Sequence, residues 1–202
     1  MVSAAKRPPF HEQLRSATHG VHVRLNRHPL LSQLTRPALD LSTYTLILER
    51  YWCFYNAAEA VIRECISEGM STFEYGARYK TDWLAKDLSC LGFKPVANGC
   101  FRNGPDFRRP RNEAELVGML YPLEGSTLGG QVISNRLGTT LGLDATNGGR
   151  FFNGYGEQTG RYWAEFLDYG DRSLRTPDEL DLACRFSQQL FARFEAHIDG
   201  RV

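Results

Sequence analysis

Apolar side chains recur at three- and four-residue spacings along most of the chain, the pattern of helices that bury one face. The first such segment extends from about Pro9 to Asn26, and its apolar face includes Leu14, Val21 and His22. A longer segment begins after Asp40 or Ser42, either of which can cap a helix, and continues to about Cys65. Both segments are predicted to be helices.

The second half of the chain shows the same periodicity. Helices are predicted over Ala77 to Leu91, from Asn112 through the stretch Leu120 to Leu137, from about Tyr162 onward, and from Thr176 to about His197. Pro122 is expected to bend the second of these and to divide it into two pieces. Residues 93–111 and the start of Phe151 to Phe166 are rich in glycine or proline and are expected to be irregular. Because no alternating β pattern is present, the predicted fold class is all-α.

Composition adds few constraints. With 202 residues and a formal net charge of +1, the chain fits one domain, with residues 1–8 as a flexible extension, and does not favour nucleic acid as a partner. No apolar run reaches the ~18 residues that span a bilayer, and the first residues lack the apolar core of a signal peptide. We therefore expect no membrane partner and a cytoplasmic location, in which the five cysteines are free thiols.

Three glycines interrupt the predicted helix in LYPLEGSTLGGQVISNRL, namely Gly125, Gly129 and Gly130. Each costs a helix about 1 kcal/mol relative to alanine. Glycine permits close approach to bare backbone, so either another helix or a flat ligand can lie against this stretch. The spacing alone favours helix packing, since a lone glycine pattern is a weak signal.

His22 is a candidate axial ligand, although nothing about one helical imidazole requires a metal. Arg15 precedes it by two helical turns, about 10 Å along the axis. Heme needs an imidazole for its iron and a cation for its carboxylates, and these two residues have those chemical types. The five histidines are too scattered for a multi-histidine metal site.

Four motifs together resemble the bacterial heme oxygenases, especially the type associated with bacteriophytochromes. The motifs are LRSATHGVH (Leu14 to His22), DWLAKDLSCLG (Asp82 to Gly92), LYPLEGSTLGGQVI (Leu120 to Ile133) and FFNGYG (Phe151 to Gly156). The resemblance extends over about residues 14–195 and implies a single helical domain that holds heme between a proximal and a distal helix. It also implies oxidative cleavage of heme to biliverdin, with release of CO and ferrous iron. Electrons would come from ferredoxin or another reductase, and a bacteriophytochrome is a candidate recipient of the product.

The resemblance assigns roles on both sides of the heme. His22 resembles the proximal iron ligand, and Arg15 matches a position where a basic residue meets a heme propionate. The distal-helix glycines, Gly125, Gly129 and Gly130, would lie over bound dioxygen and restrict which ring edge it reaches.

Other positions depart from the family pattern or keep two interpretations. Ser126 stands where mammalian members have an aspartate that orders distal water, and Asn26 stands where many members have a glutamate that orients the histidine. Tyr155 and Arg161 could bind propionates, or be a core tyrosine and a surface arginine. Glu124 could be a pocket acid or a structurally paired carboxylate.

Two alternatives to the enzyme remain open from the sequence. Ser126 and Asn26 are compatible with a heme carrier or sensor that uses the same pocket without turnover. A cofactor-free member of the fold, in which the glycines only pack helices, fits the four motifs less well.

Overall fold

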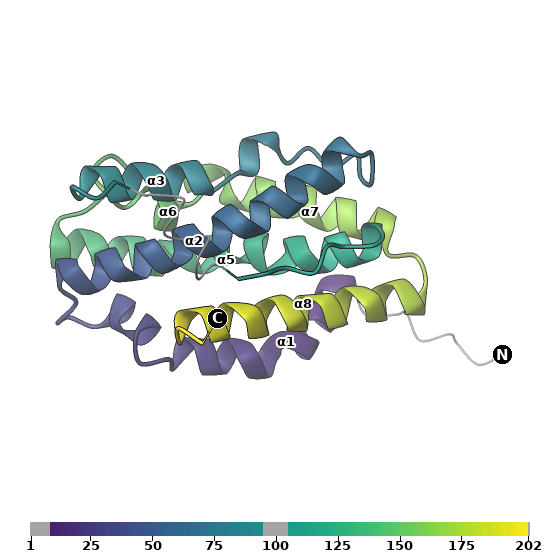
Figure 1. Ribbon diagram of the computed structural model, residues 1–202, viewed down its shortest axis with the longest axis horizontal. Helices are drawn as coiled ribbons and strands as arrows, with labels where there is room; N and C mark the ends of the chain where they lie inside the picture. Colours follow the sequence, from purple (N-terminus) through teal and green to yellow (C-terminus); the bar gives the residue numbers. More distant parts are fainter. Residues whose placement is uncertain (1–8, 95–104, 202) are drawn as a thin grey trace.

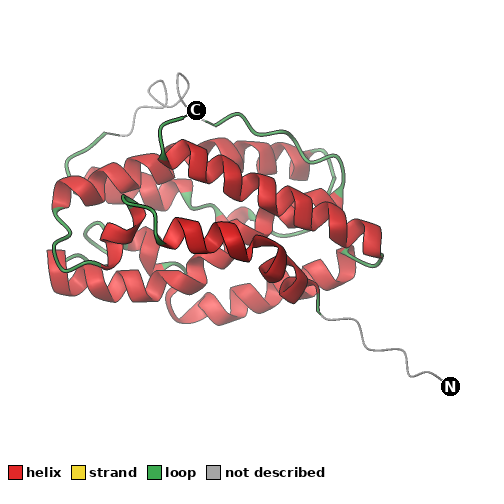
Figure 2. Ribbon diagram, turned by 90° about the horizontal axis from the view of Figure 1, so that it is seen from below, coloured by secondary structure: helices red, strands yellow, loops and turns green. Residues whose placement is uncertain are grey.

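The computed structural model describes residues 9–94 and 105–201, and this part of the chain contains helices and no strand (Figures 1 and 2). The predicted all-α class is therefore confirmed, whereas the expected extension over residues 1–8 lies outside the described residues. The α-helices are α1 (Phe10–Asn26), α2 (Leu41–Ser67), α3 (Thr81–Cys90), α5 (Glu113–Leu141), α6 (Arg150–Asn153), α7 (Thr159–Ser173) and α8 (Pro177–Ile198). Three short 3₁₀ helices connect them: η1 (Leu31–Thr35), η2 (Gly76–Arg78) and η3 (Gly156–Gln158).

Helix α8 is the main neighbour of both α1 and α5, so it holds the first helix in place beside the longest one. Its contacts with α1 have a constant offset of 171 residues, in Gln188 with Ala17 and in Arg24 with Glu195. A constant offset means that α1 and α8 run in the same direction. Figure 1 shows that α5 also shares this direction.

The contact of α5 with α8 depends on a glycine that the sequence analysis did not single out. A Cβ on Gly118 would clash with the backbone carbonyl of Ala183 on α8. The two backbones therefore approach closely here, as only glycine permits.

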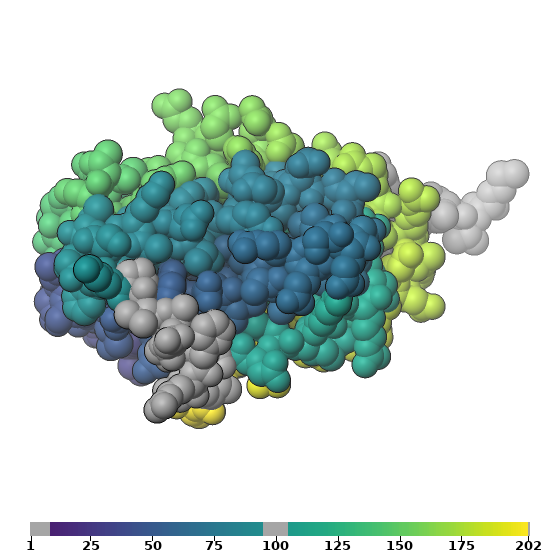
Figure 3. All heavy atoms as spheres, turned by 45° about the horizontal axis from the view of Figure 1, so that its top comes forward, coloured from purple at the N-terminus to yellow at the C-terminus, as the bar shows by residue number. Residues whose placement is uncertain are grey.

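Helices α2 and α3 form the opposite layer of the molecule and cover the face seen in Figure 3, with α7 beside them. Asp87 on α3 accepts hydrogen bonds from the backbone N–H groups of Arg150 and Phe151, both at 2.8 Å. It thereby caps the short helix α6, whose donors would otherwise be unpaired. Burial raises the pKa of the Asp87 carboxyl.

The predicted helix starts are largely confirmed. The Asp40 carboxylate accepts the N–H of Thr43 at the start of α2, and Thr176 and Glu179 form a complete capping box at the start of α8. At the start of α5, Asn112 accepts the N–H of Glu115, but the Glu115 carboxylate accepts the N–H of Arg111 instead of closing a box.

Two predicted helix boundaries are wrong. Helix α5 is one continuous helix of 29 residues, not two pieces, although Pro122 lies inside it. Packing on both α7 and α8 supports it on either side of the proline. Helix α3 begins at Thr81, not Ala77, because η2 and the residues after it direct Arg78 and Lys80 into the interior.

Among the described cysteines, Cys53 differs from the expectation of free thiols. Cys65, Cys90 and Cys184 are free thiols, but Cys53 is disulfide-bonded. Among the described residues, no helix combines the length and the hydropathy needed to cross a bilayer.

Candidate functional site

An apolar stripe on α5 lacks a covering element among the described residues. Gly125, Leu128, Gly129 and Val132 follow one another at helical spacing on one face, and the side chains of Leu128 and Val132 are 46% and 68% exposed. A Cβ added at Gly129 would meet no described atom within 4 Å. These exposed apolar side chains lie together on one face of the helix, so this face is the candidate binding surface.

The three predicted distal glycines differ in their surroundings. Gly129 faces open space, whereas a Cβ at Gly125 would lie 3.8 Å from the Trp163 ring on α7, an ordinary contact. A Cβ at Gly130 would clash with the carbonyl oxygen of Phe152 on α6. Helix packing therefore explains the glycine at position 130. Gly129 differs from the other two glycines because no described atom lies against it.

His22 was predicted on the apolar face of α1, but it lies on the exposed side, and its ring is perpendicular to that of Phe191 on α8 at a centroid distance of 6.4 Å. Its Nδ1 atom is 3.4 Å from the side-chain amide of Asn26, one turn later. Among the described residues, none is hydrogen-bonded to its Nε2 atom. The atom nearest Nδ1 is the Asn26 amide nitrogen, which donates to Nδ1 and leaves the imidazole proton on Nε2. A turn of the amide by 180° places its oxygen there instead, so that Nδ1–H donates and Nε2 has a lone pair for a metal.

Contacts between α1 and α5 place His22 at the level of the glycines. The Thr18 hydroxyl donates to the Leu14 carbonyl at 2.7 Å, and both it and the charge of Arg15 lie close enough to the Tyr121 phenol on α5 to affect its pKa. Burial raises the pKa of Tyr121, and Arg15 and Thr18 partly oppose that shift. One helical turn after Thr18 is His22, and one turn after Tyr121 is Gly125. Because the two helices run in the same direction (Figure 1), the imidazole and the apolar stripe lie at matching heights.

Ser126 has a partner that the sequence analysis missed. Its hydroxyl donates to the Leu123 carbonyl at 2.8 Å and lies 2.9 Å from the Tyr55 phenol of α2, which can then donate to it. Burial raises the pKa of Tyr55 well above its usual value, so the phenol stays protonated. No sequence motif links Tyr55 with Ser126, because the two residues meet only through the packing of α2 on α5.

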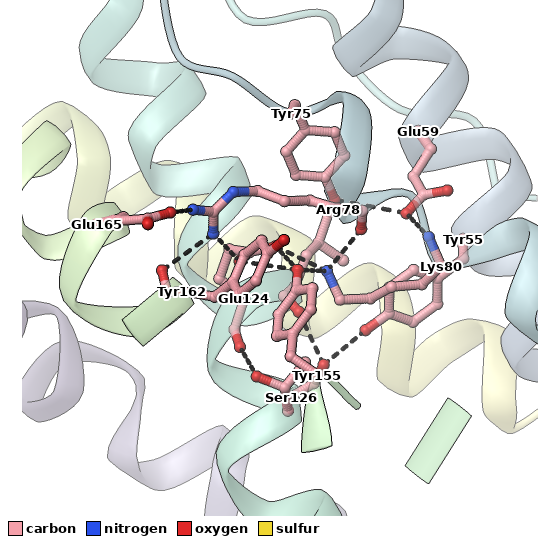
Figure 4. Close-up of polar contacts among 12 residues, drawn as sticks. Tyr55, Glu59, Tyr75, Arg78, Lys80, Glu124, Ser126, Tyr155, Tyr162 and Glu165 are labelled. Atoms are coloured by element: carbon pink, nitrogen blue, oxygen red, sulfur yellow. Dashed lines mark hydrogen bonds and ion pairs between the residues drawn. The ribbon is translucent and has the colours of Figure 1, made fainter. Parts of the chain in front are cut away.

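Glu124 lies in a buried cluster on the side of α5 away from the solvent (Figure 4). Its carboxylate accepts hydrogen bonds from Lys80 Nζ at 2.7 Å and from Arg78 Nη1 at 2.6 Å. Lys80 is fully buried, and Arg78 is 2% exposed. Of the two interpretations of Glu124, the structure supports the paired carboxylate.

Tyr155 and Arg161 lie where their side chains already have protein partners. The Tyr155 hydroxyl is 3.1 Å from both Glu124 oxygens, and its ring stacks on Tyr162 at a centroid distance of 4.1 Å. Burial, followed by the charge of Glu124, raises the pKa of the Tyr155 phenol. Arg161 is exposed and pairs with Glu165 at 3.0 Å. Their roles toward a propionate remain predictions.

The residues present fit a heme. An imidazole faces outward from α1, a cation at Arg15 lies two turns before it, and the apolar stripe of α5 offers a flat surface without bulky side chains at Gly125 and Gly129. Within residues 9–94 and 105–201, no group of three or more metal-ligating side chains occurs. A single protein ligand on an apolar macrocycle is consistent with that finding.

Comparisons with known proteins show the fold and the family of the chain. No curated protein matches the chain at a significant level. A heme oxygenase from Neisseria meningitidis, solved with NO and CO bound, superposes with a TM-score of 0.74 at 20% identity, covering 95% of this chain and 91% of the other. The heme oxygenase of Leptospira interrogans gives a TM-score of 0.75 at 15% identity, covering 94% and 98%. At these low identities, the TM-scores show a shared fold and nothing further. The sequence model of the heme oxygenases matches residues 8–199, nearly the whole chain, and the chain therefore belongs to the heme oxygenase family.

Proposed function

We propose that the chain binds heme between α1 and α5 and cleaves it oxidatively to biliverdin, with release of CO and ferrous iron. The observation that carries this proposal is the exposed imidazole of His22 at the level of the uncovered stripe on α5. Membership of the heme oxygenase family supports heme degradation as the general activity.

Each wall of the pocket contributes a different property. Heme itself supplies the iron that activates dioxygen and the ring that is cleaved. His22 offers Nε2 as the iron ligand, and Asn26 would fix the ring orientation by accepting the Nδ1 proton with its amide oxygen, after a 180° turn of the amide. Arg15 offers a cation for a propionate, and the open space at Gly129 leaves room for dioxygen.

The Tyr55 and Ser126 hydroxyls supply the polar part of the distal side. Ser126 lies beside the open face of α5, and its link to Tyr55 keeps a protonated phenol one hydrogen bond away. A hydroxyl of this kind can order a water molecule. In mammalian members, an aspartate at the position of Ser126 has this role. Gly130 contributes indirectly, by allowing α6 to hold α5 in place.

The remaining assignments rest on the sequence motifs. We propose ferredoxin or another reductase as the electron donor, a bacteriophytochrome as the recipient of biliverdin, and the cytoplasm as the location. The likeness of the four motifs to the bacteriophytochrome-associated type supports the second of these.

Titration with hemin tests the proposal. The purified chain should form a 1:1 complex with a sharp Soret band, and addition of ascorbate or a ferredoxin reducing system should replace that band with biliverdin absorption. A complex that survives reduction in air would identify a heme carrier or sensor. Absence of any 1:1 complex would contradict both functions.

A further inference from the structure

Two cations are buried outside the pocket walls: Arg78 is the last residue of η2, and Lys80 directly precedes α3. Lys80 is 0% exposed and Arg78 is 2% exposed, and both reach the same carboxylate, Glu124, which is 1% exposed. The cluster does not line the open face of α5, so the proposed binding of heme does not account for it.

Stability alone explains such a cluster poorly. The desolvation of buried ions offsets most of their attraction, and apolar residues of similar volume often stabilise a fold as well or better. What buried ion pairs can add is a defined geometry, since the oxygens of a carboxylate fit fixed donors in few orientations. The donors here surround Glu124 on three sides: Lys80 at 2.7 Å, Arg78 at 2.6 Å and Tyr155 at 3.1 Å.

The held residue lies where α5 is intrinsically weak. Pro122 has no N–H, so the carbonyl of Gly118 lacks its helical donor, and Gly125 adds a residue of low helix propensity. Glu124 lies between these two breaks and directly precedes Gly125. A side chain fixed at this point therefore sets the rotation of the helix at the start of the apolar stripe.

Arg78 connects the same point to α7. Its Nη1 atom also donates to the backbone carbonyl of Tyr162 at 3.0 Å, and the next residue, Trp163, lies against Gly125. Figure 4 shows Arg78 extended between Glu124 and Tyr162, with Glu165 at the end of the guanidinium. One side chain thus positions two neighbouring elements of the pocket.

We propose that Lys80, Arg78 and Tyr155 are positioning residues for the distal helix, holding Glu124 so that Gly125 and Gly129 face the heme. This inference rests on the proposed heme site for its functional meaning, but its structural part concerns the heme-free chain.

Amide hydrogen exchange on the heme-free protein tests the structural part. In Glu124→Gln, exchange over residues 123–133 should accelerate by about tenfold or more, because a neutral amide cannot replace a doubly charge-assisted acceptor. Glu115→Gln is the matched control: Glu115 is 5% exposed on the same helix and pairs with Arg108 at 3.0 Å, about 15 Å from Gly125 along the axis. Equal acceleration over 123–133 in the two variants would overturn the proposal.

Hemin titration, at a temperature where every variant is folded, tests the functional part. Glu124→Gln should bind hemin about tenfold more weakly than the wild type. It should also shift the pH at which water bound to the ferric iron of the complex ionises to hydroxide. Glu115→Gln should keep the wild-type value of both quantities. In the double variant Lys80→Met with Glu124→Gln, thermal stability should recover relative to Glu124→Gln, but the hemin affinity should stay low.

The outcomes separate the two proposals. Wild-type hemin affinity and wild-type spectra in Glu124→Gln would overturn the positioning role, whatever its thermal stability. Recovery of affinity together with stability in the double variant would also overturn it, because the cluster would then act through stability alone. If the wild-type chain itself formed no hemin complex, the proposed function would fail, and the exchange experiment would still decide whether Glu124 fixes α5.

Discussion

His22 is the residue on which the proposed chemistry depends most directly. His22→Ala should retain hemin in the apolar pocket but lose the spectrum of a histidine-ligated iron and lose biliverdin formation, because no other described side chain offers an imidazole at that level. Absorption spectra and product assays measure both effects, and added imidazole should restore the ligated spectrum. His19→Ala, one turn earlier on α1 and also exposed, is the control. Normal turnover in His22→Ala would refute the ligand assignment.

Gly129 and Gly130 are adjacent but should respond oppositely to alanine. Gly129→Ala meets open space and should stabilise the heme-free chain by up to about 1 kcal/mol through helix propensity. Gly130→Ala meets the Phe152 carbonyl, which cannot move freely, and should destabilise by about 1–3 kcal/mol. Urea unfolding measures both. A similar loss of stability in both variants would show that Gly129 is also packed.

A bulkier side chain at Gly129 tests its distance from the ligand. Gly129→Leu should fold, because the position is open, but it should hinder hemin binding or access of dioxygen to the iron. Soret titration and the rate of CO binding to the reduced complex report these two effects. Normal values for both would count against contact between this face of α5 and the ligand.

Single residues differ in how well the sequence predicted them. His22 and Asn26 were predictable as a pair because they lie one turn apart on one helix. Lys80 and Arg78 were not, since lysine and arginine are almost always exposed and their partner Glu124 is 44 and 46 residues away, respectively. Glu124 did carry a signal for this cluster. It is an acid in an apolar stretch with no cation nearby in sequence, and such an acid, if buried, requires a cation from a distant segment.

At the scale of elements, the strongest local signals gave the correct helix starts. The capping box of α8 is an example, and Thr176→Ala should cost about 1 kcal/mol of unfolding free energy because the N–H of Glu179 loses its acceptor. Thr176→Ser keeps a hydroxyl and should lose much less. Chemical denaturation of the three proteins distinguishes the cap from other contacts of Thr176. Equal losses in both variants would contradict the capping role.

Boundaries that depend on tertiary packing were not predictable from local signals. Pro122 indicates a break, yet α5 continues because α7 and α8 support it on both sides of the proline. The start of α3 moved from Ala77 to Thr81 for a related reason, since Glu59 on α2 accepts the N–H groups of Lys80 and Thr81. Contacts between distant segments determined both outcomes.

At the scale of the whole molecule, α8 connects the two sides of the pocket. It packs on α1 beside His22 and on α5 at Gly118, so the spacing between the proposed proximal and distal helices depends on one shared neighbour. The periodicity of α8 predicted its buried residues but not this role. The sequence of one helix shows which positions are buried, but it does not show that α1 and α5 cover them.

The end of α8 should also make the stability of the whole molecule depend on pH. His197 is 2% exposed; its Nε2 atom is 2.9 Å from the Arg50 carbonyl, and its Nδ1 atom has no partner among the described residues. Burial lowers the pKa of this imidazole, although the Arg50 carbonyl partly opposes the shift. In the unfolded chain, the imidazole has its ordinary pKa of about 6.5. The unfolded chain therefore binds the proton more tightly than the folded chain does.

The sign of this linkage gives a definite expectation. The contribution of His197 to stability should be complete above pH of about 6.5 and should be lost as the pH falls toward the lower folded-state pKa. Urea unfolding between about pH 7.5 and pH 5 should thus show a steeper loss of stability in the wild type than in His197→Gln, whose amide can still donate to the Arg50 carbonyl but does not titrate. His19→Gln controls for removing one histidine from the chain. Parallel curves for the wild type and His197→Gln would show that the buried imidazole is not linked to folding.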